Sequence, residues 1–460
     1  MNAQLLNRID EFINNNQEAM FKDIAKLVAI NSVESEPVEN GPFGQGAKDA
    51  LDAALSIADS LGLETRNYEG YMGEASIGGD GEKYLATITH ADVVPAGDGW
   101  KADPFIMREK DGYILGRGVI DDKGPTVLCF YMLKCLKELG IELKYPVRAL
   151  IGANEETGMK DLEYFIKNCP LPAFCFSPDA EFPLICGEKG IWHGKVTSNC
   201  KNESVLEITG GVAANALAST CKAKVKAVNL KSTDCVEATD NGDGTYNLTA
   251  TGLSGHASTP WLGKSAIGIM IKYILDNNIV SGEEKAFFEE AYKIHEDYSG
   301  KNIGVNASAE DFTDLTIVSG VIGVEDRHFC QSIDIRYVPS VDGQWVYEKL
   351  NSAFAAVGKI ENHRDNLPFY KSPESPEIQV CMNAYNFVTG ENVKPFTIGG
   401  GTYSRDLPNA VGFGPEHPER PMPEFVGSMH GAEEGVSKAD MLEALKIYII
   451  SMIDLQELEF

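Results

Sequence analysis

The stretch YLATITHADVV, residues 84–94, has the composition of a buried β-strand that ends in a polar loop. Side chains two positions apart on a strand share one face, so His90 and Asp92 are expected to point the same way where the strand ends. A carboxylate behind an imidazole fixes its tautomer and raises its basicity as a metal ligand. A lone histidine at a strand end is more often structural, so the metal reading needs further residues around it.

The segments that follow alternate between helix and strand patterns. Residues 124–139 (GPTVLCFYMLKCLKEL) predict a helix, and residues 145–156 (YPVRALIGANEE) and 171–183 (LPAFCFSPDAEFP) each predict a strand. Strands that alternate with helices favour an α/β domain whose mixed, mostly parallel sheet is flanked by helices.

The composition changes after about residue 190, where Thr and Ser become frequent and the pattern predicts strands of alternating polar and apolar residues. This indicates an inserted α+β domain over residues 192–373, with helices near 261–277 and 342–357. The Pro/Ser-rich stretch 367–377 is the expected return linker. The catalytic domain then consists of residues 1–191 and 374–460. Its closing helix follows Ser437, with Asp440 completing a capping box.

Composition excludes several classes of function. The 460 residues carry 40 Lys plus Arg against 68 Asp plus Glu, a formal charge of −28, which disfavours nucleic acid and anionic membranes as partners. No apolar run reaches the roughly 20 residues of a membrane-spanning helix, and no signal-peptide core is found at the N-terminus. The ten cysteines form no CxxC pair, which is typical of reduced thiols. We expect a soluble, cytoplasmic enzyme.

Acidic residues recur where the predicted elements end. The loop GRGVIDDKGP contains Asp121 and Asp122, the segment GANEETG contains Glu155 and Glu156, and SPDA contains Asp179. The carboxyl ends of strands in an open α/β sheet meet in one crevice, so these acids are expected at a common site. Each alone could be a solvated loop residue, but clustered anions need cations to offset their repulsion. One member of the Glu155–Glu156 pair could bind metal while the other acts as a base.

A second nitrogen ligand is expected from His430 in GSMHGAEEGV, which lies in a glycine-flanked loop before the final helix. A surface histidine would be the simpler interpretation if it stood alone. The remaining histidines outside the quoted motifs are left as structural: His193, His295, His328, His363 and His417.

Six ordered stretches resemble one known family: HADVVPAGDGW, GRGVIDDKGP, GANEETG, SPDA, GLSGHASTP and MHGAEEG. The chain is similar to the di-zinc metallopeptidases and deacylases that include peptidase V-type dipeptidases, carnosinases, aminoacylase and succinyl-diaminopimelate desuccinylase. GGGTYSRDLPNAVGFGP resembles the dipeptidase branch, and the motifs span residues 90–435.

The resemblance implies a metal site and its ligands. Asp121 would bridge two Zn²⁺ ions, with Mn²⁺ or Co²⁺ as possible substitutes. The other ligands would be His90 and Asp179 at one ion, and Glu156 and His430 at the other. Glu155 would be the general base and Asp92 would orient His90. The family also has a cis peptide after the bridging aspartate.

The resemblance also implies substrate contacts, most of them from the inserted domain. His256 would stabilise the oxyanion, Arg336 would bind the substrate's C-terminal carboxylate, and Asn215, Gly400 and Gly401 would contribute further contacts. One departure is Ser265, which stands where the family usually has Asn. The inserted domain is longer than the lid of relatives that dimerise through it, which implies a monomer.

Three functions remain to be compared. The first is a dipeptidase that cleaves small unblocked peptides. The alternative is a deacylase or desuccinylase of N-acyl amino acids that uses the same two metals. The third is an inactive metal-binding or scaffold protein, which the presence of all five ligands and Glu155 disfavours.

Overall fold

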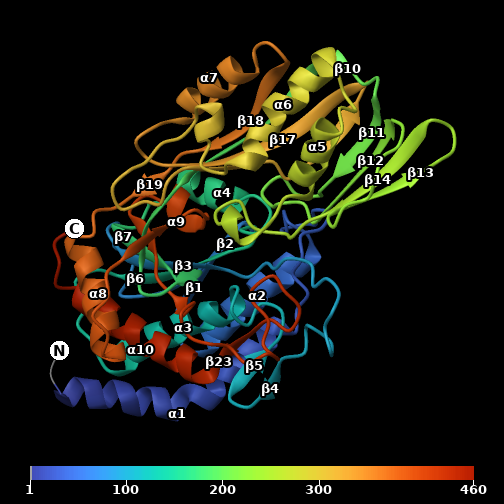
Figure 1. Ribbon diagram of the computed structural model, residues 1–460. Helices are drawn as coiled ribbons and strands as arrows, with labels where there is room; N and C mark the ends of the chain where they lie inside the picture. The colour runs from blue at the N-terminus through green and yellow to red at the C-terminus, as the bar shows by residue number, and fades with distance from the viewer. Residues whose placement is uncertain (1–2) are drawn as a thin grey trace. The chain divides into compact units, whose positions relative to one another are not determined.

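Residues 3–460 are described by a computed structural model, and they divide into two compact units (Figure 1). Of the described residues, unit 1 comprises 3–186, 371–396 and 401–460, and unit 2 comprises 187–370 and 397–400. The inserted domain was expected at residues 192–373. A second passage into unit 2, at Thr397–Gly400, was not expected from the sequence.

The central sheet of unit 1 is mixed. Its strands lie in the order β1 (Glu64–Tyr68), β2 (Met72–Ile77), β6 (Val147–Gly152), β3 (Leu85–His90), β7 (Phe174–Ser177), β21 (Ala410–Gly412) and β9 (Ile185–Glu188). The four strands β6, β3, β7 and β21 pair in parallel, and the outer pairs are antiparallel. Every residue of β3 and β6 is buried, which explains their near-continuous apolar sequences. The predicted α/β class is confirmed, but the expectation of a mostly parallel sheet is wrong: only the three central strand pairs are parallel, and the pairs outside them are antiparallel.

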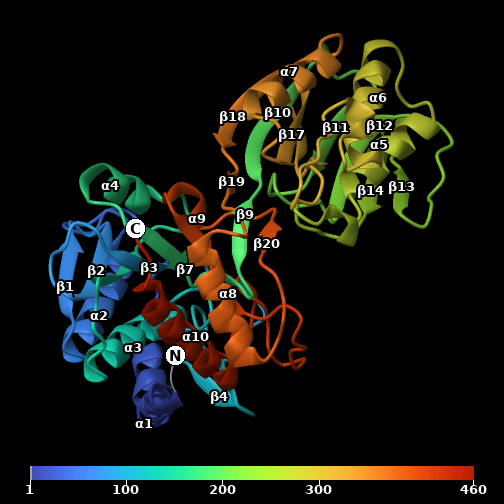
Figure 2. The same cartoon turned by 90° about the vertical axis from the view of Figure 1, so that its left-hand side faces the viewer.

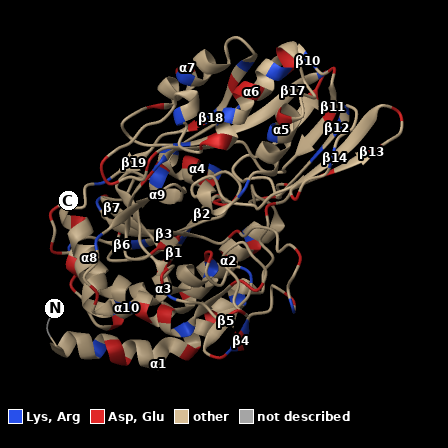
Figure 3. Cartoon of the chain, viewed as in Figure 1, with Lys and Arg blue, Asp and Glu red and all other residues tan. Residues whose placement is uncertain are grey.

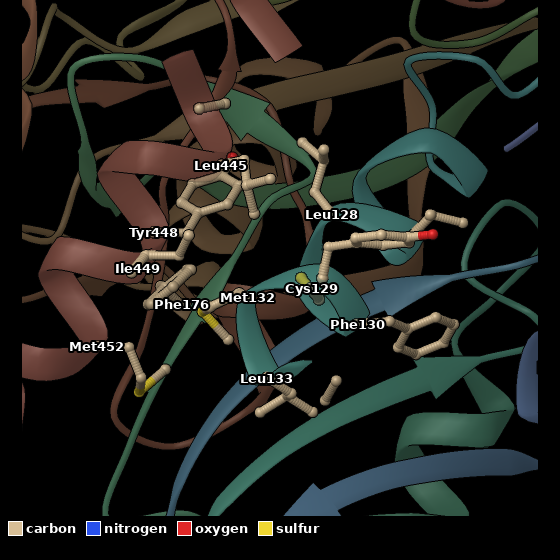
Figure 4. Close-up of a cluster of buried hydrophobic side chains, with 14 of the residues drawn as sticks. Leu128, Cys129, Phe130, Met132, Leu133, Phe176, Leu445, Tyr448, Ile449 and Met452 are labelled. Atoms are coloured by element: carbon tan, nitrogen blue, oxygen red, sulfur yellow. The ribbon is translucent and has the colours of Figure 1, made fainter. Parts of the chain in front are cut away.

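Helices cover both faces of this sheet, as Figures 1 and 2 show. They are α1 (Ala3–Val28), α2 (Gln45–Ser60), α3 (Lys123–Glu138), α4 (Lys160–Asn168), α8 (Pro376–Thr389), α9 (Tyr403–Asp406) and α10 (Lys438–Leu455). One buried cluster joins α1, α2, α3, α8 and α10 to one face, and a smaller one joins α4 and α9 to the other. Figure 4 shows the larger cluster, where Leu128 and Met132 of α3 meet Tyr448 of α10 and Phe176 of β7. Unit 1 is therefore a three-layer α/β domain.

Short strands complete unit 1. A three-stranded sheet contains β4 (Arg108–Lys110), β5 (Tyr113–Leu115) and β23 (Gly435–Ser437), and β8 (Ala180–Glu181) pairs with β22 (Pro415–Glu416). The closing helix begins as predicted, since Oγ of Ser437 accepts a hydrogen bond from the backbone N–H of Asp440. The carboxylate of Asp440, however, binds Arg420 at 2.5 Å.

Unit 2 is an α+β domain. Its strands are β10 (Gly190–Lys201), β11 (Val205–Gly210), β12 (Thr220–Lys226), β13 (Val236–Asp240), β14 (Thr245–Thr251), β15 (Thr316–Val318), β16 (Ile322–Glu325), β17 (His328–Tyr337), β18 (Gly358–Asn366) and β19 (Phe369–Tyr370). Its helices are η1 (Pro260–Leu262), α5 (Ala266–Asp276), α6 (Gly282–Glu296), η2 (Lys301–Ile303) and α7 (Gly343–Phe354). The chain enters unit 2 within β9 and again within β20 (Phe396–Ile398), and it returns to unit 1 after Tyr370 and after Gly400. Helices α5 and α7 lie near the expected ranges 261–277 and 342–357, whereas α6 was not expected.

Charged residues occur along the whole chain. Figure 3 shows acidic residues in red and basic residues in blue on elements from α1 to α10. Among residues 3–460, no helix combines the length and the apolar character that crossing a membrane requires.

Candidate di-metal active site

Three neighbouring parallel strands of unit 1 end beside one another and deliver most of the predicted ligands. His90 is the last residue of β3, Glu155 and Glu156 follow β6, and Asp179 follows β7. Because these strands are adjacent and parallel, their carboxyl ends meet at one edge of the sheet. Asp121 comes from the loop before α3, and His430 from the loop before β23.

Asp121 lies between the two histidines. Its Oδ1 is 3.0 Å from Nε2 of His90, and its Oδ2 is 2.8 Å from Nε2 of His430. The carboxylate is buried, and the peptide bond to Asp122 is cis, as the resemblance implied. One aspartate thus presents a different oxygen to each histidine, which is the arrangement a bridging ligand requires.

The remaining ligands complete two groups around Asp121. Oδ2 of Asp179 lies 3.7 Å from Nε2 of His90, and Oε2 of Glu156 lies 3.1 Å from Nε2 of His430. Donor atoms around one tetrahedral Zn²⁺ are about 3.4 Å apart, given metal–ligand distances of about 2.0–2.2 Å. The observed separations therefore suit a metal ion in each group.

A buried oxygen without a hydrogen-bond partner and the clustering of negative charge both support metal binding here. Oε1 of Glu156 is buried and has no hydrogen-bond partner within residues 3–460. Burial, together with the charge of Asp121, raises the pKa of Asp179 to about 7. Without cations the anions resist burial and repel one another, and two divalent ions would relieve both effects. The residues present fit a pair of divalent cations.

The carboxylate of Asp92 faces His90 and also contacts the loop that follows β6. Nδ1 of His90 is 3.0 Å from the backbone carbonyl of Asp92 and 3.4 Å from its Oδ1. The two carboxylate oxygens accept the backbone N–H groups of Glu155 and Glu156, each at 3.2 Å. Asp92 therefore contacts His90 through both its backbone carbonyl and its carboxylate, and the carboxylate also holds the loop that carries both glutamates.

Glu155 lies beside this cluster. Burial raises the pKa of its carboxyl well above the usual value, and the negative charge of Asp179 raises it further. A general base works best when its pKa lies near the operating pH, so a raised value suits a carboxylate that takes a proton from water.

Asp161 and Tyr403 also hold the Glu155–Glu156 loop, and neither was expected from the sequence. Oδ2 of Asp161 accepts the backbone N–H groups of Ala153 and Asn154 at 2.7 and 2.8 Å, and the Tyr403 hydroxyl at 2.5 Å. Gly152 ends β6 at this point. A Cβ there would lie 1.9 Å from the Tyr403 hydroxyl, so the position has no room for a side chain.

The substrate contacts that the resemblance implied lie in unit 2, except Gly401. The backbone N–H of Ala257 donates to the Asn215 carbonyl, which places Asn215 beside the His256 loop. Gly400 belongs to unit 2 and Gly401 to unit 1.

Arg336 is buried on β17, and its Nε donates to Oδ1 of Asp334 at 2.8 Å. Its Nη1 donates to the Gly399 carbonyl at 3.0 Å. These contacts fix the plane of the guanidinium and place it beside the glycine stretch.

The loop of His256 fixes its tautomer. The backbone N–H of Ser258 donates to Nδ1 at 3.3 Å, and the Ser258 hydroxyl, which can also donate, lies 2.7 Å from the same nitrogen. With Nδ1 as the acceptor, the neutral ring carries its proton on Nε2. Burial, with the nearby charge of Arg336, lowers the pKa of this histidine and favours that neutral form. His256 can therefore offer Nε2–H as a hydrogen-bond donor.

Ser265, the departure from the family pattern, is the N-cap of α5, where its Oγ accepts the backbone N–H of Gly268 at 3.1 Å. Ser and Asn are comparably good N-caps, so the replacement preserves the start of this helix.

A third group of possible ligands contains His417, Asp440 and Glu443. The guanidinium of Arg420 donates to Asp440 at 2.5 Å and to Glu443 at 2.7 Å. A cation already pairs with both carboxylates, so this group is an ion-pair cluster.

A buried histidine (His90), a half-exposed one (His430) and several carboxylates meet at the carboxyl edge of the parallel strands, an arrangement that suits a metal-dependent hydrolase. Residues 86–452 match the sequence profile described as peptidase family M20/M25/M40. The chain belongs to this family.

Two curated relatives span nearly the whole chain. A Beta-Ala-Xaa dipeptidase of Lactobacillus delbrueckii subsp. lactis is 31% identical over 95% of this chain and 96% of its own. The putative dipeptidase YtjP of Bacillus subtilis is 29% identical, with coverage of 95% and 97%. Among solved structures, human carnosine dipeptidase 1 aligns with a TM-score of 0.59 at 16% identity over 99% of both chains, a likeness of fold.

Proposed function

We propose that this chain is a metal-dependent dipeptidase that hydrolyses small unblocked peptides, β-alanyl dipeptides among them. The observation that carries the proposal is the placement of Asp121 between His90 and His430, with Glu155 beside the cluster. The names of the curated relatives and membership of the peptidase family support the choice of a peptide bond as the target.

Two divalent ions, which we propose to be Zn²⁺, would supply an activated water and polarise the substrate carbonyl. His90, Asp179 and Asp121 would hold one ion, and His430, Glu156 and Asp121 the other. Mn²⁺ and Co²⁺ suit the same nitrogen and oxygen donors.

Glu155 moves the proton in this proposal. Its backbone N–H is fixed by Asp92, and its raised pKa lets the carboxylate accept a proton from water and return it to the leaving amine. A proton transfer of this kind contributes typically about 10²–10⁴ in rate.

Residues of unit 2 are proposed to bind and orient the substrate. The guanidinium of Arg336, held by Asp334, would bind the C-terminal carboxylate with two parallel hydrogen bonds. His256 would donate from Nε2 to the carbonyl oxygen as negative charge develops there. Asn215, Gly400 and Gly401 are proposed as further contacts with the peptide backbone.

The decisive experiment compares substrates at matched concentrations after metal analysis of the purified chain. Alanyl and β-alanyl dipeptides should be cleaved, and N-acetyl and N-succinyl amino acids should be poor substrates. A clear preference for the acyl substrates would identify a deacylase or desuccinylase. A chain that binds metal yet cleaves neither class would be an inactive member.

We further propose that the protein is a cytoplasmic monomer. The size of unit 2, which supplies a long sheet from a single chain, supports the monomer. Light scattering during size-exclusion chromatography tests it, and a dimer mass would contradict it.

A further inference from the structure

A buried ion pair lies directly behind the candidate metal ligands. The side chains of Arg117 and Glu434 are 1% and 0% exposed, and Nη1 of Arg117 donates to Oε2 of Glu434. Neither residue is among the proposed ligands or substrate contacts. A fully buried ion pair is costly to form because both charges lose their water. We therefore ask which parts of the site this pair holds in place.

Glu434 holds the loop that leads to Asp121. Its Oε1 accepts the backbone N–H groups of Gly118, Ile120 and Asp121 at 2.9, 3.2 and 3.4 Å. Oε1 thus accepts three hydrogen bonds and Oε2 accepts one from the guanidinium, and all four donors belong to the loop of residues 117–121. The carboxylate therefore uses its full capacity as an acceptor on this one loop.

Arg117 holds the loop that carries His430. Its Nη2 lies 3.2 Å from the His430 carbonyl, 3.4 Å from the Gly431 carbonyl and 3.3 Å from the Ala96 carbonyl. The planar guanidinium presents several donors in fixed directions, which a lysine cannot reproduce.

We propose that Arg117 and Glu434 are positioning residues that set the separation between Asp121 and His430, and so determine the affinity of the metal position between them. Glu434 contacts the backbone of Asp121, Arg117 contacts the backbone of His430, and the two side chains bind each other. Within residues 3–460, neither Arg117 nor Glu434 forms a hydrogen bond or ion pair with His90 or Asp179, so that group depends on the pair only through Asp121. The inference rests on the proposed two-metal function.

The chain offers a matched control next to this pair. Glu433 forms an ion pair with Arg108 at 2.9 Å and accepts the backbone N–H of Lys101, also at 2.9 Å. It belongs to the same segment as Glu434, but its bonds do not reach the loop that leads to Asp121.

The experiment measures Zn²⁺ affinity of the metal-depleted full-length chain by titration, and the visible absorption of the chain loaded with Co²⁺. In Glu434→Gln the amide nitrogen faces either Arg117 or the backbone N–H groups, so one set of bonds is lost. We expect one of the ions to bind about 10–100-fold more weakly, the usual effect of losing a group that supports a ligand. We also expect an altered Co²⁺ spectrum. Glu433→Gln should leave both measurements unchanged.

Wild-type affinity for both ions in Glu434→Gln would overturn the inference, and so would equal weakening in Glu433→Gln. If circular dichroism shows that Glu434→Gln does not fold, Arg117→Lys is tested by the same Zn²⁺ titration and Co²⁺ spectrum. This variant keeps the positive charge but loses the several donors that the guanidinium holds in one plane. Failure of the wild-type chain to bind metal would instead overturn the proposed function.

Discussion

Nε2 of His430 lies 2.8 Å from Oδ2 of Asp121, although the two residues come from distant parts of the sequence. His90 faces the other oxygen of the same carboxylate. If each group binds one ion, Asp121 is a ligand of both ions, whereas His90 and His430 are each a ligand of one.

Metal content should therefore depend on which residue is changed. We expect His430→Ala to retain about one ion per chain where the wild type holds about two, and Asp121→Ala to retain neither, because its loss removes the shared ligand. Elemental analysis after dialysis measures the content. Equal retention in the two variants would contradict a bridging role for Asp121.

Replacement of Glu155 should separate catalysis from metal binding. We expect Glu155→Gln to keep about two ions per chain and to lose about 10²–10⁴ in kcat, because the amide cannot accept a proton. Metal analysis and steady-state kinetics on the same sample test this. Turnover close to that of the wild type would exclude Glu155 as the base.

Arg336 should discriminate between free and blocked C-termini. Asp334 and the Gly399 carbonyl hold its guanidinium in place. We expect Arg336→Lys to raise KM for a dipeptide by about 10–100-fold, since a charge-assisted hydrogen bond contributes about 1.5–3 kcal/mol. The same dipeptide with an amidated C-terminus should change little. Equal losses on both substrates would argue against carboxylate binding.

The stability of unit 2 should fall in acid because of His295. This histidine lies on α6 with its side chain against Gly268 of α5, and burial lowers its pKa to about 3. The unfolded value is about 6.5, so the neutral ring contributes stability above pH 6.5 that is lost as the pH falls toward 3. Between pH 6.5 and 5 the loss is about 2 kcal/mol.

Hydrogen exchange of backbone amides in β17 between pH 7 and 5, corrected for intrinsic rates, measures this loss. His295→Asn removes the titrating group, so its stability should depend less steeply on pH than that of the wild type. Identical pH dependence in the two proteins would show that His295 does not charge on unfolding in this range.

The sequence was informative about the site wherever ligands follow strands. His90, Glu156 and Asp179 were predictable because parallel strands bring their carboxyl ends together, and the structure places these residues around Asp121. Their roles as ligands stay predictions until metal is measured.

The supporting contacts were less predictable. Glu434 lies within the quoted MHGAEEG motif, yet only tertiary packing decides that it accepts three backbone N–H groups while the adjacent Glu433 binds Arg108. The same holds for the carboxylate of Asp92. The missed helix α6, by contrast, left a readable signal, since its segment GEEKAFFEEAYKIHE places apolar residues at helical spacing.

Gly152 contacts neither metal nor substrate in the proposed site, yet the site should not tolerate its substitution. Any side chain there would displace the Tyr403 hydroxyl and Asp161, which hold the backbone just before Glu155. When codon 152 is randomised and the library is selected for growth on a dipeptide as the sole source of an essential amino acid, the survivors should encode glycine alone.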